Sequence, residues 1–167
     1  MKTSIFNGSN FGKLEFNYSV TFRPRHNVYI QGMQKQIEYL FKDVNYVYLC
    51  YSWENDRYSK VKHSHSLVNT KISENILINK IKQNLESNGE PSKIEREIIY
   101  TEPRKLLNPK TGEKITTLAK KKINVVSTEI SGKHGSVFVE KIVSNLSSSL
   151  YCMKFTDTGA NFGYLQR

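Results

Sequence analysis

The chain has 167 residues, of which 38% are hydrophobic and 11% aromatic, enough for one compact domain with a real core. Lysine and arginine total 25 against 15 acidic residues, and the resulting net charge of +10 favours a polyanionic partner, most commonly nucleic acid. No stretch approaches the length of a membrane span and no secretory leader opens the chain, so we expect a cytoplasmic protein with no membrane partner. Cys50 and Cys152 lie far apart and are interpreted as reduced thiols.

The first half of the chain alternates between strand and helix patterns. Residues 1–13 are rich in glycine, asparagine and serine, and we expect them to be loose. Alternating polarity predicts a strand over Leu14–Phe22, and apolar residues at helical spacing predict a helix over residues 30–43. The segments "NYVYLCYSW" (45–53) and "VKHSHSLV" (61–68) are typical of strands, and the short turn between them predicts a hairpin.

The second half continues with a helix that Ser73 is expected to cap at its N-terminus. Residues 88–121 are interpreted as an insertion, a basic hairpin of two short strands. Residues 123–130 and 136–143 are predicted strands, and "SNLSSSLYCMKF" is a predicted short final helix. The expected fold is therefore α+β: one domain covering all 167 residues, with a central antiparallel sheet of four to five strands and two or three flanking helices.

A candidate metal site begins with His63 and His65. A strand has a side-chain period of two, so both imidazoles point to one face, about 7 Å apart along the strand, where they could share a metal ion. The alternative is two exposed polar residues on an edge strand. If the hairpin forms, Glu54 returns beside the histidines, with Glu129 and Glu140 as rival carboxylates. Such a mixed nitrogen and oxygen site suits Mn²⁺ or Mg²⁺, although Zn²⁺, Co²⁺ or Ni²⁺ could also bind.

A candidate nucleophile lies near the end of the chain. Tyr151 and Lys154 are three residues apart in the predicted final helix and so share a face. A tyrosine hydroxyl, which ordinarily has a pKa of about 10, is a poor nucleophile at neutral pH, but a nearby ammonium or metal favours the phenolate. Lys154 could also hold a phosphate or protonate a leaving oxygen. The alternative for Tyr151 is a tyrosine packed in the core.

These motifs, in this order, resemble those of the HUH endonucleases, and most closely the rolling-circle replication initiators (Rep) of small phages and single-stranded DNA viruses. "YLCYSWENDRYSKVKHSHSLV" is similar to their strand pair with a glutamate followed by HxH. "HGSVFVEKIVSNLSSSLYCMKF" is similar to their strand leading into a helix with the YxxK motif, and "YSVTFRPRH" occupies the place of their first strand motif. The resemblance covers residues 15 to 156 in order, except for 88–121.

The resemblance implies a ferredoxin/RRM-like core in which Glu54, His63 and His65 bind a divalent metal. It implies that Tyr151 attacks a phosphate of single-stranded DNA, at an origin hairpin or nick site, leaving a free 3′-hydroxyl and a 5′-phosphotyrosine, and that Lys154 assists. It also implies a viral or plasmid protein that starts rolling-circle DNA replication in the cytoplasm of a bacterial host.

Three features depart from the family pattern. The middle residue of HxH is usually bulky and apolar, whereas here it is Ser64, on the opposite strand face. Only one tyrosine occupies the YxxK motif, so a two-tyrosine mechanism is not expected. No helicase segment follows the predicted final helix, so unwinding would need a host helicase or another part of a longer protein.

Basic residues are the expected DNA contacts: Arg23, Arg25, Lys62, Lys120, Lys121 and Lys122. A run of charge is usually a solvated face, but this one could also follow a DNA backbone, and such contacts would give steep salt dependence. Two alternative functions remain open: a single-tyrosine HUH transposase, and a non-catalytic domain that binds single-stranded DNA or RNA.

Overall fold

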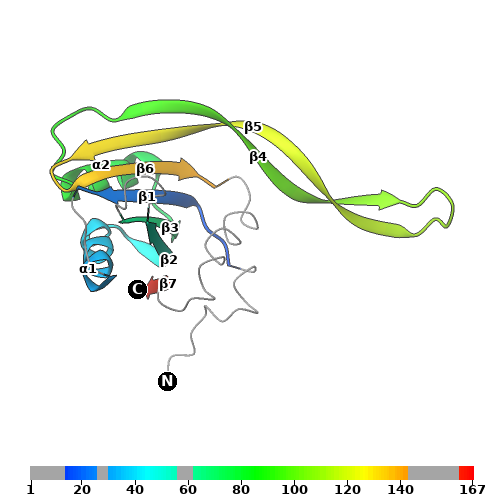
Figure 1. The fold of residues 1–167 in the computed structure, drawn as a ribbon, viewed down its shortest axis with the longest axis horizontal. Coiled ribbons are helices and arrows are strands. Elements are labelled where there is room, and N and C mark those ends of the chain that lie inside the picture. Colours follow the sequence, from blue (N-terminus) through cyan, green and yellow to red (C-terminus); the bar gives the residue numbers. More distant parts are fainter. Residues whose placement is uncertain (1–13, 26–29, 56–61, 143–161) are drawn as a thin grey trace, which may run out of the picture.

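The computed structural model describes residues 14–25, 30–55, 62–142 and 162–167. These residues form an α+β fold built on one large antiparallel sheet with two helices (Figure 1). The class agrees with the prediction, but the described part of the sheet has seven strands, more than the expected four to five. The extra strands come from a long hairpin and from a short strand at the C-terminal end.

The sheet has the strand order β4-β5-β6-β1-β3-β2-β7, and every neighbouring pair is antiparallel. The elements in chain order are β1 (Tyr18–Pro24), α1 (Ile30–Leu40), β2 (Tyr46–Asn55), β3 (Lys62–Thr70), α2 (Glu74–Asn84), β4 (Ser92–Leu107), β5 (Lys114–Gly132), β6 (Gly135–Lys141) and β7 (Phe162–Gln166). Helix α1 connects β1 to β2 across β3, and α2 leads from β3 to the strands on the other side of β1. This interleaving of two crossovers is the split β-α-β arrangement.

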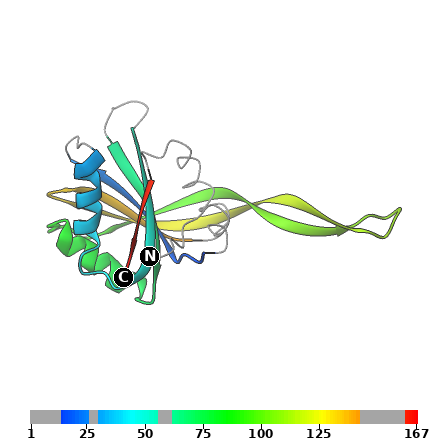
Figure 2. The ribbon, with the colours of Figure 1, turned by 90° about the horizontal axis from the view of Figure 1, so that it is seen from below.

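Both helices cover the same face of the sheet (Figure 2). Alternate residues of β1, including Val20 and Phe22, point into this face and are buried, as the period of two requires. Ile37 of α1 and Ile81 of α2 are both fully buried against them. The main core therefore lies between this face and the helices, because each element has one apolar side that it must remove from water.

The predicted cap of α2 is confirmed. The Ser73 Oγ accepts a hydrogen bond from the Ile76 backbone N–H at 3.5 Å, just before the helix begins at Glu74. Near the end of α2, the buried Asn84 Nδ2 donates to the Leu40 carbonyl at 2.9 Å and ties the two helices together. Each of these helices has 11 residues, and no helix in the described ranges is long and apolar enough to cross a membrane.

Several predicted boundaries were wrong. β1 begins at Tyr18 and not at Leu14. The proposed short strands of the insertion are in fact the outer parts of β4 and β5, two long paired strands, and β5 includes the strand predicted over 123–130. β7 was not predicted. The loose segment expected over 1–13 and the final helix expected after β6 lie outside the described residues.

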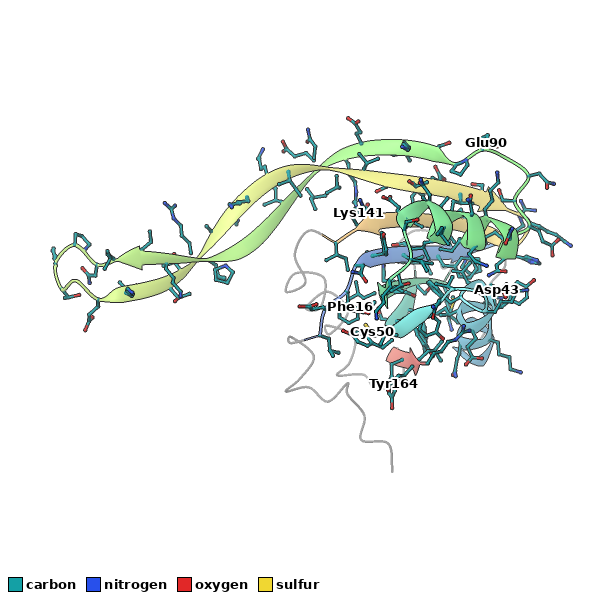
Figure 3. All side chains as sticks on the ribbon, turned by 180° about the vertical axis from the view of Figure 1, so that it is seen from behind. Phe16, Asp43, Cys50, Glu90, Lys141 and Tyr164 are labelled. Atoms are coloured by element: carbon teal, nitrogen blue, oxygen red, sulfur yellow. The ribbon has the colours of Figure 1, made fainter. Side chains whose placement is uncertain are left out.

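The second face of the sheet, opposite α1 and α2, carries a small apolar cluster at one end. Phe16, Cys50 and Leu67 are buried there, and the ring of Phe16 meets Tyr48 edge-on at 5.6 Å between centroids. Figure 3 labels Phe16 and Cys50 in this cluster. Further along the same face lie the residues that the sequence suggested as a metal site, and we call this face the histidine face.

Candidate metal-binding site on the histidine face

His63 and His65 lie on one side of β3, as the strand period requires. Their ring centroids are 4.9 Å apart and the rings are nearly perpendicular, at 84°. His63 is buried, with 6% of its surface exposed, and His65 is half-buried. The two imidazoles thus form a close pair within the protein surface, and they are not two exposed residues on an edge strand, because β1 and β2 flank β3 on either side.

Glu54 is the direct cross-strand partner of His63 in the ladder between β2 and β3. Residues that face each other in an antiparallel pair have Cβ atoms about 4.5–5.5 Å apart and share a face of the sheet. The hairpin register therefore brings the backbone of the predicted carboxylate residue to the histidine pair. Its side chain is not among those that the structure describes.

Glu129 and Glu140, the rival carboxylates, are less well placed than Glu54 to share a metal with the histidines. Glu140 of β6 accepts a bidentate pair of hydrogen bonds from Arg96, with Nη2 2.7 Å from Oε1 and Nε 3.0 Å from Oε2, and a further bond from the Ser127 hydroxyl. Glu129 of β5 lies three strands away from β3, about 14 Å at a strand spacing of about 4.8 Å. The strand register thus favours Glu54 as the carboxylate nearest the histidines.

Thr21 was missed by the sequence reasoning. It is the β1 partner of His65, and its Oγ1 lies 3.1 Å from His65 Nδ1. If Nδ1–H donates to this hydroxyl, the lone pair of the ring sits on Nε2, the arrangement typical of a metal-binding imidazole whose orientation is fixed by a neighbour. On the β2 side of His65, Ser52 is fully buried and its Oγ has no hydrogen-bond partner among the described residues.

The donors fit a divalent cation. Two imidazoles, completed by the carboxylate of Glu54 from the facing strand, would make a mixed nitrogen and oxygen set with positions open for further ligands. Among the described side chains, no three or more His, Cys, Asp or Glu residues form a group that could hold a metal. The side chain of Glu54 is not one of those described side chains. The third ligand of such a site therefore depends on Glu54.

Ser64, between the two histidines, points to the opposite face, into the core beneath α1 and α2. It is fully buried beside its ladder partners Phe22 and Trp53, and its Oγ has no hydrogen-bond partner in the described part of the chain. Trp53 stacks on Tyr51 with centroids 5.5 Å apart. Burial raises the pKa of Tyr51 to about 12. Trp53 is therefore a core residue and does not face the histidine pair.

The predicted DNA contacts are distributed over separate surfaces. Arg23 follows Thr21 by two residues on β1, so it shares the histidine face, and it is exposed. Arg25 is exposed at the end of β1, and its backbone N–H donates to the carbonyl of His134. Lys62 begins β3 and is half-buried. The lysines at 120–122 lie on β5 well beyond the body of the sheet, and so they are not brought to the histidines.

Tyr151 and Lys154, the predicted nucleophile and its helper, lie outside the described residues. Comparisons of this chain with protein-family models, with curated proteins and with solved structures found no match. The roles assigned to the site residues therefore rest on the sequence motifs and on the geometry of the histidine face.

Proposed function

We propose that this protein is a metal-dependent, site-specific endonuclease of the HUH type that nicks single-stranded DNA to start rolling-circle replication. The observation that carries the proposal is the histidine pair, with ring centroids 4.9 Å apart and with Glu54 opposite His63 in the strand ladder. The split β-α-β order of β1, α1, β2, β3, α2 and β6 supports it, because a ferredoxin-like core is the fold expected of this class.

The histidine face supplies the groups that such an enzyme needs. His63, His65 and Glu54 would hold Mn²⁺ or Mg²⁺, which when bound supplies Lewis-acid polarisation of a phosphodiester and orients it. The contact with the Thr21 hydroxyl helps to orient the His65 ring and, when Nδ1–H donates to it, leaves Nε2 for the metal. The guanidinium of Arg23, on the same face, is suited to hold a DNA phosphate because its planar donors match phosphate oxygens.

The cleavage step falls to Tyr151 and Lys154. The Tyr151 phenol loses its proton to solvent water, and its oxygen attacks phosphorus. A bond then forms between that oxygen and phosphorus while the bond from phosphorus to the 3′-oxygen breaks. Lys154 gives a proton to the departing 3′-oxygen, which leaves a free 3′-hydroxyl and a 5′-phosphotyrosine. The ester keeps the bond energy for later rejoining.

The test is a search for the covalent adduct. The protein is incubated with a library of single-stranded oligonucleotides and Mn²⁺, and peptides containing Tyr151 are analysed by mass. We expect an adduct in the wild type, none in Tyr151→Phe, and none in His63→Ala, while Tyr151→Phe still binds the same oligonucleotide. If the wild type binds single strands but forms no adduct with either Mn²⁺ or Mg²⁺, the second candidate applies, a non-catalytic single-strand-binding domain, which the net charge of +10 also favours.

A further inference from the structure

The β4–β5 hairpin extends far beyond the body of the protein. β5 leaves β6 at Ser127, and from there outward β4 and β5 pair with each other, and with no other described strand, up to Leu107 opposite Lys114. We call residues 98–123 the arm. Its ten successive cross-strand pairs span about 30 Å at roughly 3.3 Å per residue. Figures 1 and 2 show it as a twisted two-stranded ribbon that projects from one end of the sheet.

The arm is strongly basic. It contains seven lysines and arginines but two glutamates, so its net charge of +5 is half of the charge of the whole chain. The cationic residues are Arg104, Lys105, Lys110, Lys114, Lys120, Lys121 and Lys122. A charge of this density on a thin projection creates a positive potential that attracts a polyanion.

The alternation of the strands gathers four of these cations on one side of the arm. Lys105 and Lys114 lie on it near the tip, and Lys120 and Lys122 lie closer to the body. We call this side the lysine face. Lys122 pairs with Glu97 at 2.9 Å, whereas the other three make no ion pair with any side chain in the described ranges. They are therefore available to an external anion.

Large apolar side chains on the lysine face are also exposed. Ile99, Leu107 and Leu118 are 60%, 66% and 67% exposed. Figure 3 shows the side chains of the arm standing out from the ribbon on both sides. An isolated two-stranded ribbon is marginally stable in water, so apolar groups on such an arm favour a bound partner that covers them.

We propose that the arm is a docking element for duplex DNA and enters a groove of the double helix with its lysine face on the phosphates. The major groove of B-DNA, about 12 Å wide, admits a two-stranded β-ribbon. The length of the arm, about 30 Å, approaches one turn of the duplex, about 34 Å. The apolar side chains would contact base edges such as thymine methyl groups. This surface is separate from the histidine face, and the proposal does not depend on the nicking activity.

The test measures binding of a fluorescent duplex of about 21 base pairs, two helical turns, by anisotropy over a series of salt concentrations. The same sequence as a single strand and as duplex RNA serves for comparison. We expect the wild type to prefer duplex DNA. In Lys105→Ala/Lys120→Ala, the loss of two phosphate contacts should lower the salt slope by about 1.8, since each contact contributes a slope of about 0.9. With the wild type and the variant equal in affinity at about 1 M salt, this slope difference lowers the affinity of the variant at 0.1 M salt by about 60-fold.

The matched control is Lys35→Ala/Lys71→Ala. It removes the same charge from exposed positions on the body. The arm variant and this control lose the same net charge, so any effect of net charge on DNA association is equal in the two. If the arm has a specific role, the control should lose less than threefold in affinity for the duplex. A shortened chain, in which Asn-Gly replaces residues 99–122 and the pair of Ile98 with Ile123 is kept, should fold with the melting transition of the wild type, lose duplex binding and keep any adduct formation at Tyr151.

Three results would overturn the proposal. The arm variant could bind duplex DNA as the wild type does, or the wild type could prefer the single strand or duplex RNA. Sedimentation could also show that the wild type is a dimer and the shortened chain a monomer with unchanged duplex binding, in which case the arm docks on a second copy of this chain. Failure of adduct formation in the wild type would count against the proposed function and would leave the assignment of the arm intact.

Discussion

Replacing Thr21 by valine removes one hydroxyl from the histidine face and keeps the shape of the side chain. The Thr21 Oγ1 lies 3.1 Å from His65 Nδ1, so the substitution leaves both candidate imidazole ligands in place but removes one contact that restrains the tautomer and orientation of the His65 ring. If the pair binds a metal, Thr21→Val should therefore weaken metal binding.

The size of the effect follows from the position of Thr21 outside the ligand set. Loss of a hydrogen bond to a ligating histidine lowers metal affinity by about 10–100-fold. At a Mn²⁺ concentration of about 100 times the wild-type Kd, bound metal stabilises the wild type by about 2.7 kcal/mol, and the same concentration would stabilise Thr21→Val by about 0.4–1.4 kcal/mol. For a chain of this size, about 3 °C per kcal/mol gives metal-induced shifts in Tm of about 8 °C and about 1–4 °C.

The assay compares thermal unfolding with and without Mn²⁺, supported by calorimetric titration of the metal. Ser19→Ala is the control, because Ser19 lies on the same face of β1 but opposite Leu67, away from the histidines. It should keep the full shift. If Thr21→Val lowers the Tm of the metal-free protein but keeps the full metal-induced shift, the hydrogen bond is structural only. If the shift becomes larger, Nδ1 and not Nε2 binds the metal.

Three further predictions concern stability. Ser64→Ala should raise the free energy of unfolding by about 1 kcal/mol in urea titrations, because it removes a buried hydroxyl that has no partner in the described ranges; a loss of stability would contradict this. Gly135→Ala should lower the free energy of unfolding by about 3 kcal/mol, because Gly135 has φ +144° and a Cβ there would lie 2.3 Å from the Arg23 carbonyl oxygen. Gly89→Ala is the control: Gly89 has open space around it, so the substitution should change the free energy of unfolding by less than about 0.5 kcal/mol. The hydrogen bond with His134 lowers the pKa of Glu86 in the folded protein from its ordinary value of 4.5. The ionised Glu86 therefore stabilises the folded state above pH 4.5, and this stabilisation is lost as the pH falls through the lowered pKa of the folded protein. The urea midpoint of Glu86→Gln should therefore fall less than that of the wild type on acidification below pH 4.5, and parallel curves would refute this.

The sequence by itself determined several of the local elements and which face of β3 the two histidines share. The period of two places His63 and His65 on one side of a strand wherever that strand lies in the fold. The short connection between the two strands predicted the hairpin that sets Glu54 opposite His63, and Ser73 marked the start of α2. These features depend on residues close together in the chain, whose spacing is visible in the sequence.

The extent of the arm could not be read from the sequence. Strands that pack on a core show alternating polarity, but much of the outer part of β4 and β5 is exposed on both sides and has no such pattern. Without that signal, the segment appeared as a short inserted hairpin. Its direction away from the body follows from the pairing of β5 with β6, which ends at Ser127.

Only the tertiary structure decided which strands flank the histidines. β1 lies between β3 and β6, and this brings Thr21 to His65 across more than 40 residues of chain and separates Glu129 from the site. The helices cover the opposite face, where Ser64 and Trp53 are buried. The physical reason is that the pairing of distant strands is selected by the burial of a whole sheet face under two helices, and that burial depends on all of the elements together.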